Sequence, residues 1–346
     1  RWHGRRPFRR PFFLSWRAGC LARLWRRVNE GGVTTYSAGT QQQTVRVACP
    51  AACGELVQGS WQGVRCLVSC PIERYSVATI TLEATPEWQA PPDCPKTVAA
   101  LRVALAECGR PQVGGQLRLA SPVPRGRGYG SSTADIGAAV CALGYALGVP
   151  FSERQMARIA TQVEPSNSTL FPGMAAFDHR EGSFLRLLGP APPLVVVVLD
   201  PGGEVDTVGF NRLDHRPMLA RLAPQHDEAF ALLCAGLEQA CWEQVGQAAS
   251  SSARAHQALL FNPRLEPTFE LARAVGALGV CRAHSGTLLG LLFDPLHADI
   301  GAVVDWLRPR LAEDIAAYRL VDGGPRVQEH GGGTEVHREK ERPFAL

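Results

Sequence analysis

Residues Pro124 to Val140 read PRGRGYGSSTADIGAAV, in which Gly126, Gly128 and Gly130 alternate with other residues before two serines and a small apolar run. Glycine adopts positive φ at low cost and lets a backbone approach another group closely. The preceding segment, GGQLRLASPVP, has the alternation of a strand, and the run from Thr133 is typical of a closely packed helix. A strand, a glycine-rich loop and a helix N-terminus, in this order, are what an anion site needs.

Phosphate binding is one interpretation of this stretch. The three glycines and the N–H groups of Ser131, Ser132 and Thr133 would cradle phosphates, because a helix N-terminus offers unpaired N–H groups and partial positive charge. No lysine follows the last glycine as in a Walker loop. The other interpretation is a tight turn and a helix capped by Ser131 or Ser132. The spacing alone leaves both open.

A family resemblance favours the phosphate site. The pattern P-x-x-x-G-x-G-S-S-x-A, from Pro124 to Ala134, resembles the nucleotide loop of the GHMP kinases. Three further stretches resemble, in order, the L-threonine kinase branch of cobalamin biosynthesis: CPAACGELVQG (49–59) with LVSCPIERYS (67–76), VEPSNSTLFPGMAAFDH (163–179) and AHSGTLLGLLFD (283–294). The resemblance implies an α+β fold with an N-terminal ribosomal-S5-like domain and a C-terminal ferredoxin-like domain.

The same resemblance implies ATP-dependent phosphorylation of L-threonine to L-threonine O-3-phosphate, for the aminopropanol arm of the corrinoid. Ser132 and Glu164 match the family's Mg²⁺ ligands, and hydroxyl and carboxylate oxygens suit that ion. Asp178 is the candidate general base, although the homoserine kinase branch manages without one. The nucleotide-binding positions implied are Pro124, Gly126, Gly128, Gly130, Ser131, Ser132, Thr133, Ser285 and Gly286.

Glu55 and Asn167 are the candidate substrate-binding residues. Glu55 falls on a polar position of the amino-acid segment and could receive the substrate ammonium, or be a solvated loop acid. Arg282 or Arg254 could bind the substrate carboxylate. Asn167 stands where this branch has Asp, and the lost charge leaves two alternatives open. These are a homoserine or other small-alcohol kinase, and a catalytically silent binding protein of the same fold.

The length of 346 residues exceeds what one hydrophobic core usually supports. We therefore expect a nucleotide-binding domain over 44–190 and a second domain over 191–324, divided at the Pro-rich GPAPP (189–193). Residues 1–43, a basic and then polar extension, and the tail 325–346 have no core-forming pattern, and we expect both to be disordered.

Outside residues 1–29, charge and hydropathy argue against nucleic-acid and membrane partners. Nine of the 36 Lys and Arg residues lie in residues 1–29, which contain no acid, so the remainder carries more acidic than basic residues. The arginines, Trp and Phe of residues 1–29 leave RNA, DNA or an anionic membrane open as partners of that arm. For the rest of the chain, the sequence predicts no nucleic-acid partner and no membrane partner. Because no segment is as long and apolar as a membrane span, we expect a cytoplasmic protein. A homodimer is left open.

Eleven cysteines, an odd number, argue against a disulfide framework. Cys49, Cys53, Cys66 and Cys70 have spacings compatible with zinc, but buried reduced thiols are the favoured interpretation.

The remaining hydrophobic patterns predict the other elements. TVRVACP and YSVATITLEA are expected to be strands, with PAACGELVQGSWQG (50–63) as a loop between them. Ser152 is expected to start a helix that ends at Glu164, and GSFLRLLG and LVVVVLDPGG are expected to be strands, the second fully buried. Further helices are predicted at 96–107, 216–222, 227–250, 267–277 and 300–311, and a loop leading into a buried strand at 281–294.

Overall fold

The computed structural model describes residues 44–203, 209 and 213–330, so the expectations for 1–43 and 331–346 lie outside the described residues. One mixed sheet runs through them in the order β10-β7-β9-β8-β1-β2-β4-β3, with β11 beside β1, and with β5 pairing with both β2 and β6. Its strands are β1 (Thr44–Trp61), β2 (Val64–Glu83), β3 (Trp88–Gln89), β4 (Gly114–Ala120), β5 (Met174–Phe177), β6 (Leu185–Gly189), β7 (Val195–Asp200), β8 (Gly279–Arg282), β9 (Leu289–Phe293), β10 (Asp314–Arg319) and β11 (Arg326–His330).

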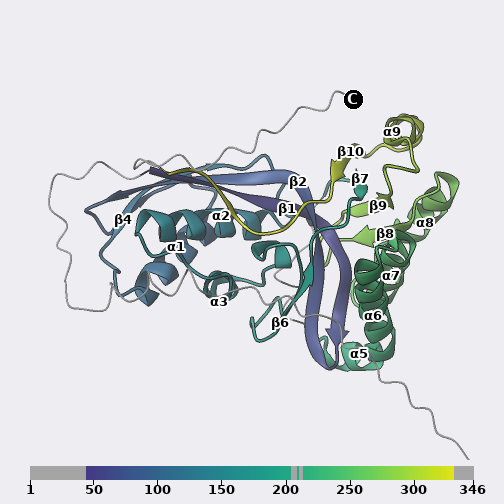
Figure 1. Ribbon diagram of the computed structural model, residues 1–346, viewed down its shortest axis with the longest axis horizontal. Coiled ribbons are helices and arrows are strands. Elements are labelled where there is room, and N and C mark those ends of the chain that lie inside the picture. Colours follow the sequence, from purple (N-terminus) through teal and green to yellow (C-terminus); the bar gives the residue numbers. More distant parts are fainter. Residues whose placement is uncertain (1–43, 204–208, 210–212, 331–346) are drawn as a thin grey trace, which may run out of the picture. The chain divides into compact units, whose positions relative to one another are not determined.

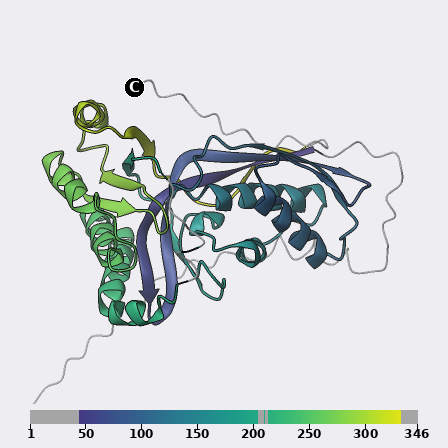
Figure 2. The ribbon, with the colours of Figure 1, turned by 180° about the vertical axis from the view of Figure 1, so that it is seen from behind.

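Helices cover this sheet in groups (Figures 1 and 2). The helices are α1 (Pro95–Glu107), α2 (Ser131–Ala146), α3 (Glu153–Val163), α5 (Arg216–Arg221), α6 (Ala223–Gln239), α7 (Trp242–His256), α8 (Leu265–Ala274) and α9 (Ile300–Leu307), with 3-10 turns η2 (Ser168–Leu170) and η3 (Arg308–Arg310). Helix α2 packs on β1 and β2, α1 and α3 pack beside it, and α6 and α7 pack on β1. The mixture of helices and sheet agrees with the predicted α+β class, and the domain boundary at residue 190 stays a prediction.

Three apolar clusters form the core. The first lies between α1 to α3 and the β1, β2 and β4 strands, the second between β1, β2, β7 and helices α6 and α7, and the third beneath α8 and α9. Of the predicted strand LVVVVLDPGG, the residues VVVVLD form β7, and every residue of β7 is buried, as predicted. The strand ends at Asp200, before Pro201.

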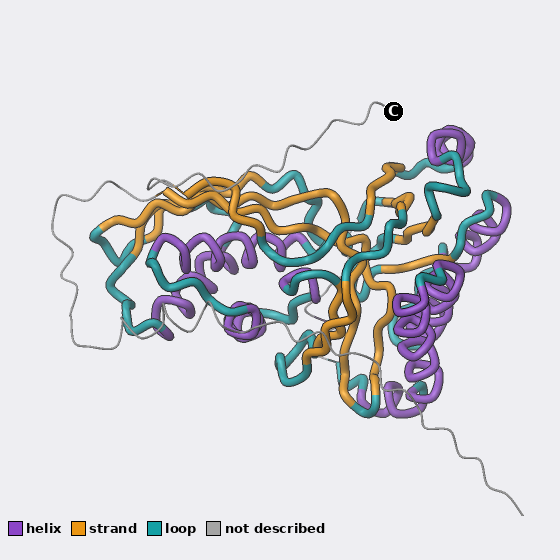
Figure 3. Tube along the Cα trace, viewed as in Figure 1, coloured by secondary structure: helices purple, strands orange, loops and turns teal. Residues whose placement is uncertain are grey.

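The stretch 50–63 was expected to be a loop, and this was wrong for most of it. Strand β1 continues to Trp61, and only Gln62 and Gly63 form the turn into β2 (Figure 3). The β1–β2 register shifts between Pro50 and Ala51 and on both sides of Glu55, as bulges do. Gly54, with a φ of 57°, permits this path, and a Cβ there would lie 2.3 Å from the backbone carbon of Arg282. Pro and Gly here mark a bulged strand.

Other expectations also need correction. The helix predicted over 227–250 is two helices, because Ala240 adopts a left-handed conformation with a φ of 52° and ends α6. Residues 326–330, predicted to belong to a disordered tail, form β11, which pairs antiparallel with Val45 to Ala48 of β1. Strands β3, β5 and β10 were not predicted, and Cys281 and Arg282, expected to begin a loop, are the last residues of β8. The helix start at Ser152 is confirmed, since the Ser152 side chain caps α3 in a capping box with Gln155.

The four cysteines considered for zinc are buried in β1 and β2. Among residues 44–203, 209 and 213–330 the cysteines are free thiols, and no group of three or more potential metal ligands occurs there. Within the same ranges, no helix has the length and apolar character needed to cross a membrane.

Candidate active site

The backbone of the glycine-rich loop lines a pocket at the N-terminus of α2. Gly126, Gly128 and Gly130 all have positive φ, at 73°, 108° and 66°. Gly130 is the N-cap of α2, and no side-chain hydrogen bond caps the helix. Ser131 and Ser132 are the first two helical residues, so neither has the capping role that was the alternative interpretation. The uncapped N–H groups and the helix dipole suit a bound anion.

The segment 283–287 packs against this loop from another part of the chain. The N–H groups of Thr287 and Leu288 donate to the Arg127 carbonyl oxygen at 2.9 and 3.0 Å. A Cβ at Gly128 would lie 2.3 Å from the Ala283 Cβ. The two glycine-containing motifs, distant in sequence, therefore form one structure.

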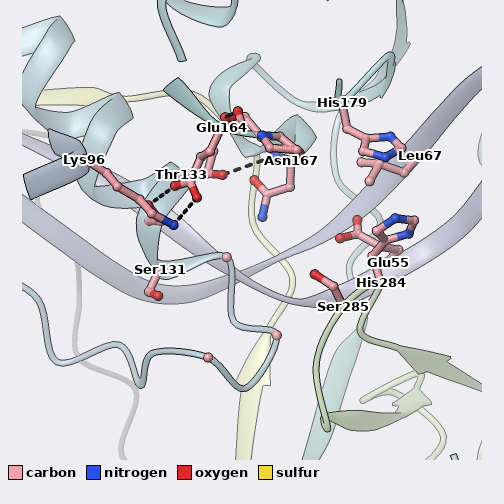
Figure 4. A pocket seen from close by; sticks show the side chains of 16 residues that line it. Glu55, Leu67, Lys96, Ser131, Thr133, Glu164, Asn167, His179, His284 and Ser285 are labelled. Atoms are coloured by element: carbon pink, nitrogen blue, oxygen red, sulfur yellow. Dashed lines mark hydrogen bonds and ion pairs between the residues drawn. The ribbon is translucent and has the colours of Figure 1, made fainter. Parts of the chain in front are cut away.

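Lys96, Ser132 and Glu164 meet at one end of the pocket, which we call the phosphate end. Lys96 Nζ lies 2.5 Å from Glu164 Oε2, and the Ser132 hydroxyl donates to Glu164 Oε1. Glu164 is the extended residue that ends α3, and Lys96 lies in the first turn of α1. Figure 4 shows Lys96 and Glu164 on the same side of the pocket as Ser131 and Thr133. A cation beside a carboxylate and a hydroxyl offers both a phosphate partner and hard oxygen ligands.

The opposite end of the pocket, the acceptor end, contains Glu55, Leu67, His179, His284 and Ser285 (Figure 4). Glu55 is 6% exposed, and its Oε2 atom has no hydrogen-bond partner among the described residues. Burial raises the pKa of Glu55 to about 8, although a hydrogen bond with the Ser69 side chain acts in the opposite direction. A ligand ammonium at Oε2 would pair with the ionised form of Glu55 and would stabilise that form against the effect of burial.

Two histidine rings contact each other edge to face at the acceptor end. The His179 and His284 rings lie 4.7 Å apart between centroids at an interplanar angle of 64°, and His284 Nδ1 lies 2.6 Å from Gln58 Oε1. Burial, the largest cause for both rings, lowers the pKa of each well below its ordinary value. Both imidazoles are therefore neutral at pH 7.

Asn167 lies between the two ends of the pocket. Its Oδ1 accepts hydrogen bonds from the Thr169 hydroxyl and N–H at 2.6 and 3.3 Å, which caps η2. Its own N–H donates to Thr133 Oγ1 at 3.2 Å. The backbone N–H of Asn167 therefore connects the segment after Glu164 to the first turn of α2.

The structure does not bring Asp178 into the pocket. Its carboxylate accepts hydrogen bonds from the N–H groups of Arg180, Glu181 and Ser183 and from the Ser183 hydroxyl at 2.5 Å. Asp178 thus holds the turn after β5, because four donors already occupy its oxygens, and it is not among the described residues that line the pocket.

The two arginines considered for the substrate carboxylate also lie elsewhere. Arg282 is buried and donates to Gln257 Oε1 and the Leu260 carbonyl, and Arg254 packs over the Phe269 ring. Of the remaining predicted residues, Pro124 and Gly286 do not line this pocket among the described residues, although Gly286 packs against the Arg127 carbonyl of the loop.

Sequence reasoning missed Lys96 and Leu67, and it treated His179 as an ordinary loop residue. Lys96 is 68 residues from Glu164, and no local pattern marks that approach. His179 could have been found from its place beside the Asp178 turn in one of the quoted motifs.

Comparison with known proteins places the chain among kinases. Residues 96–174 match the GHMP kinases N terminal domain. The chain is 32% identical over 298 residues to an L-threonine kinase of Salmonella typhimurium, covering 81% of this chain and 94% of that protein. An L-threonine kinase of Citrobacter freundii is 31% identical over 292 residues, covering 81% and 98%. The crystal structure of homoserine kinase from Cytophaga hutchinsonii has a TM-score of 0.63 at 17% identity, covering 85% of this chain and all of that one, which is a likeness of fold.

Proposed function

The chain belongs to the GHMP kinase family of ATP-dependent phosphotransferases, and from this premise we propose that its acceptor is the side-chain hydroxyl of L-threonine. The product would be L-threonine O-3-phosphate, used in the aminopropanol arm of cobalamin. The similarity to L-threonine kinases over most of the chain supports this acceptor. The observation that carries the proposal is one pocket with two chemically different ends, a glycine loop at a helix N-terminus and an unpaired buried Glu55 carboxylate.

At the phosphate end, the loop N–H groups and Lys96 would hold the phosphates of ATP. Ser132 and Glu164 would hold Mg²⁺, since their hydroxyl and carboxylate oxygens already converge and are the ligands this ion prefers. When bound, Mg²⁺ neutralises the charge that develops during phosphoryl transfer. Because phosphoryl transfer depends mainly on positioning and electrostatics, the absence of Asp178 from the pocket is compatible with activity.

At the acceptor end, Glu55 would bind the substrate ammonium and so orient the side-chain hydroxyl toward the phosphate end. Asn167 lines the pocket between the two ends, so it could contact either ATP or L-threonine. Its neutral side-chain amide already accepts a hydrogen bond from the Thr169 hydroxyl and packs against Gly130. A requirement for ATP fits the predicted cytoplasmic location. A homodimer and the absence of nucleic-acid and membrane partners stay predictions.

The test is ADP release by the full chain with ATP, Mg²⁺ and, in parallel, L-threonine, L-serine and L-homoserine. We expect turnover that is selective for L-threonine and absent in Glu164→Gln. Preferred turnover of L-homoserine would replace the proposal with a homoserine kinase. Retained ATP binding without turnover of any of the three would identify a silent binding protein.

A further inference from the structure

Leu67 and His179 are brought to the acceptor end by the same strand pair. Leu67 of β2 pairs with Phe177 of β5, and His179 follows Phe177 by two residues. The His179 carbonyl accepts a hydrogen bond from the Ser166 N–H at 2.8 Å, and the Asp178 carboxylate fixes the turn that follows. The backbone around His179 is therefore held on both sides.

His179 has unused hydrogen-bonding capacity. The residue is 2% exposed, and neither Nδ1 nor Nε2 has a hydrogen-bond partner within the described part of the chain. A buried polar atom without a partner destabilises the free protein, because the atom has lost its hydrogen bonds to water and gained none in return. Because His179 lines the pocket, a bound ligand can satisfy one of these nitrogens.

The charge state of the ring defines what it can bind. Burial, Arg65, Arg180 and His256 all lower the pKa of His179, and the ring of His284 packs against it. A neutral imidazole offers one acceptor nitrogen and one N–H donor. It can therefore accept a hydrogen bond from a hydroxyl, which a protonated ring could not.

Leu67 supplies the apolar counterpart. It is 2% exposed, and among the described residues that line this pocket only Leu67 has an aliphatic side chain other than a proline ring. L-Threonine differs from L-serine by one methyl group, carried on the carbon that bears the hydroxyl. A pocket that selects a secondary alcohol needs a polar contact and an apolar contact next to each other.

We infer that His179 and Leu67 form a subsite that recognises the hydroxyl-bearing carbon of the acceptor: His179 accepts a hydrogen bond from the hydroxyl, and Leu67 packs against the methyl group. This inference rests on the proposed function for the class of acceptor. His179 is assigned the hydroxyl and Leu67 the methyl group. Their contributions to binding can therefore be separated with three ligands that have both groups or only one of them.

The experiment measures binding of L-threonine, L-serine and L-2-aminobutyrate to the full chain with a non-hydrolysable ATP analogue. L-Serine lacks the methyl group, and L-2-aminobutyrate lacks the hydroxyl. Leu67→Ala should weaken L-threonine and L-2-aminobutyrate by about tenfold or more and leave L-serine unchanged. His179→Ala should weaken L-threonine and L-serine by roughly 3- to 10-fold and leave L-2-aminobutyrate unchanged.

The controls are Leu187→Ala and His297→Gln, which change side chains of the same types on exposed positions of β6 and the segment before α9. Both should leave all three affinities unchanged. Leu67→Val and His179→Gln serve if an alanine variant fails to fold, and should give the same pattern with smaller effects.

The outcomes separate the two hypotheses. Equal weakening of all three ligands, or none, in both folded variants overturns the subsite. Selective binding with the expected pattern, but no phosphorylation by the wild-type chain, supports the subsite and overturns the kinase assignment. Failure of the wild-type chain to bind L-threonine overturns both.

Discussion

Gly130 and Asn167 touch at the start of α2, so that a Cβ on residue 130 would lie 2.0 Å from the Asn167 amide nitrogen. Gly130 also has a φ of 66°, a conformation that costs a non-glycine residue about 1 to 2 kcal/mol. The loop can take its path only if residue 130 has no side chain, because both the backbone and the neighbouring amide exclude one.

We therefore expect Gly130→Ala to displace either the loop or Asn167 and to lower the affinity for ATP by about tenfold or more. Calorimetric titration with an ATP analogue measures this. Gly148→Ala is the matched control, since Gly148 has a φ of 69° but nothing within 4 Å of its missing Cβ. Gly148→Ala should lose only the stability that the positive φ costs, and it should keep its ATP affinity. Equal ATP affinities in the two variants would contradict the role given to this contact.

Asn167 should tolerate Asp better than Ala. Its Oδ1 accepts hydrogen bonds from the Thr169 N–H and hydroxyl, and a carboxylate oxygen can accept the same two. Asn167→Ala should lower the free energy of unfolding by about 0.5 to 2 kcal/mol, the usual effect of a lost cap. Asn167→Asp should stay close to wild type in urea unfolding. If Asp and Ala destabilise equally, the amide nitrogen rather than Oδ1 is the important atom.

The loop and helix around Gly130 could be predicted because their determinants are local. The alternating glycines predict residues with positive φ, and Ser152 followed by Gln155 predicts a capping box. The bulged course of β1 through Gly54 could not be predicted, since the residues look like a loop and only the approach of Arg282 explains them. Ser132 and Glu164 could be located because they lie in family motifs. Their partner Lys96 could not, because it approaches Glu164 only in the folded chain, from 68 residues away.

Glu164→Gln and Ser132→Ala should each lower kcat by about 10² to 10³ or more while leaving the thermal midpoint nearly unchanged, because these groups act on charge that develops in the transition state. In Glu164→Gln, Lys96 also loses the carboxylate that lies 2.5 Å away. Steady-state turnover at saturating ATP and L-threonine measures kcat, and thermal unfolding measures the midpoint.

Glu107→Gln is the matched control for this pair. Glu107 accepts from Arg158 at 2.8 Å, an ion pair between α1 and α3 outside the pocket. Its kcat should equal that of the wild type. A Glu164→Gln enzyme as active as Glu107→Gln would remove Glu164 from the catalytic machinery.

Glu55 should make the stability of the free protein depend on pH. Burial raises its pKa from 4.5 to about 8, so between these values the folded protein keeps a proton that the unfolded chain has released. The unfolding free energy should therefore fall as pH rises through this window, and Glu55→Gln should remove that part of the slope. Urea unfolding at several pH values measures both proteins.

The same group should make amino-acid binding depend on pH in the opposite direction. At pH 6 the Glu55 carboxyl is mostly protonated, given a pKa of about 8, and a neutral carboxyl attracts an ammonium poorly. L-Threonine affinity should therefore rise from pH 6 to pH 8, because the ammonium pairs with the ionised form and binding then no longer has to displace a proton. Glu55→Gln should bind more weakly at pH 8 and lose this dependence. A Glu55→Gln variant with the wild-type pH profile would show that the ammonium lies elsewhere, and the unpaired Oε2 would then need another ligand.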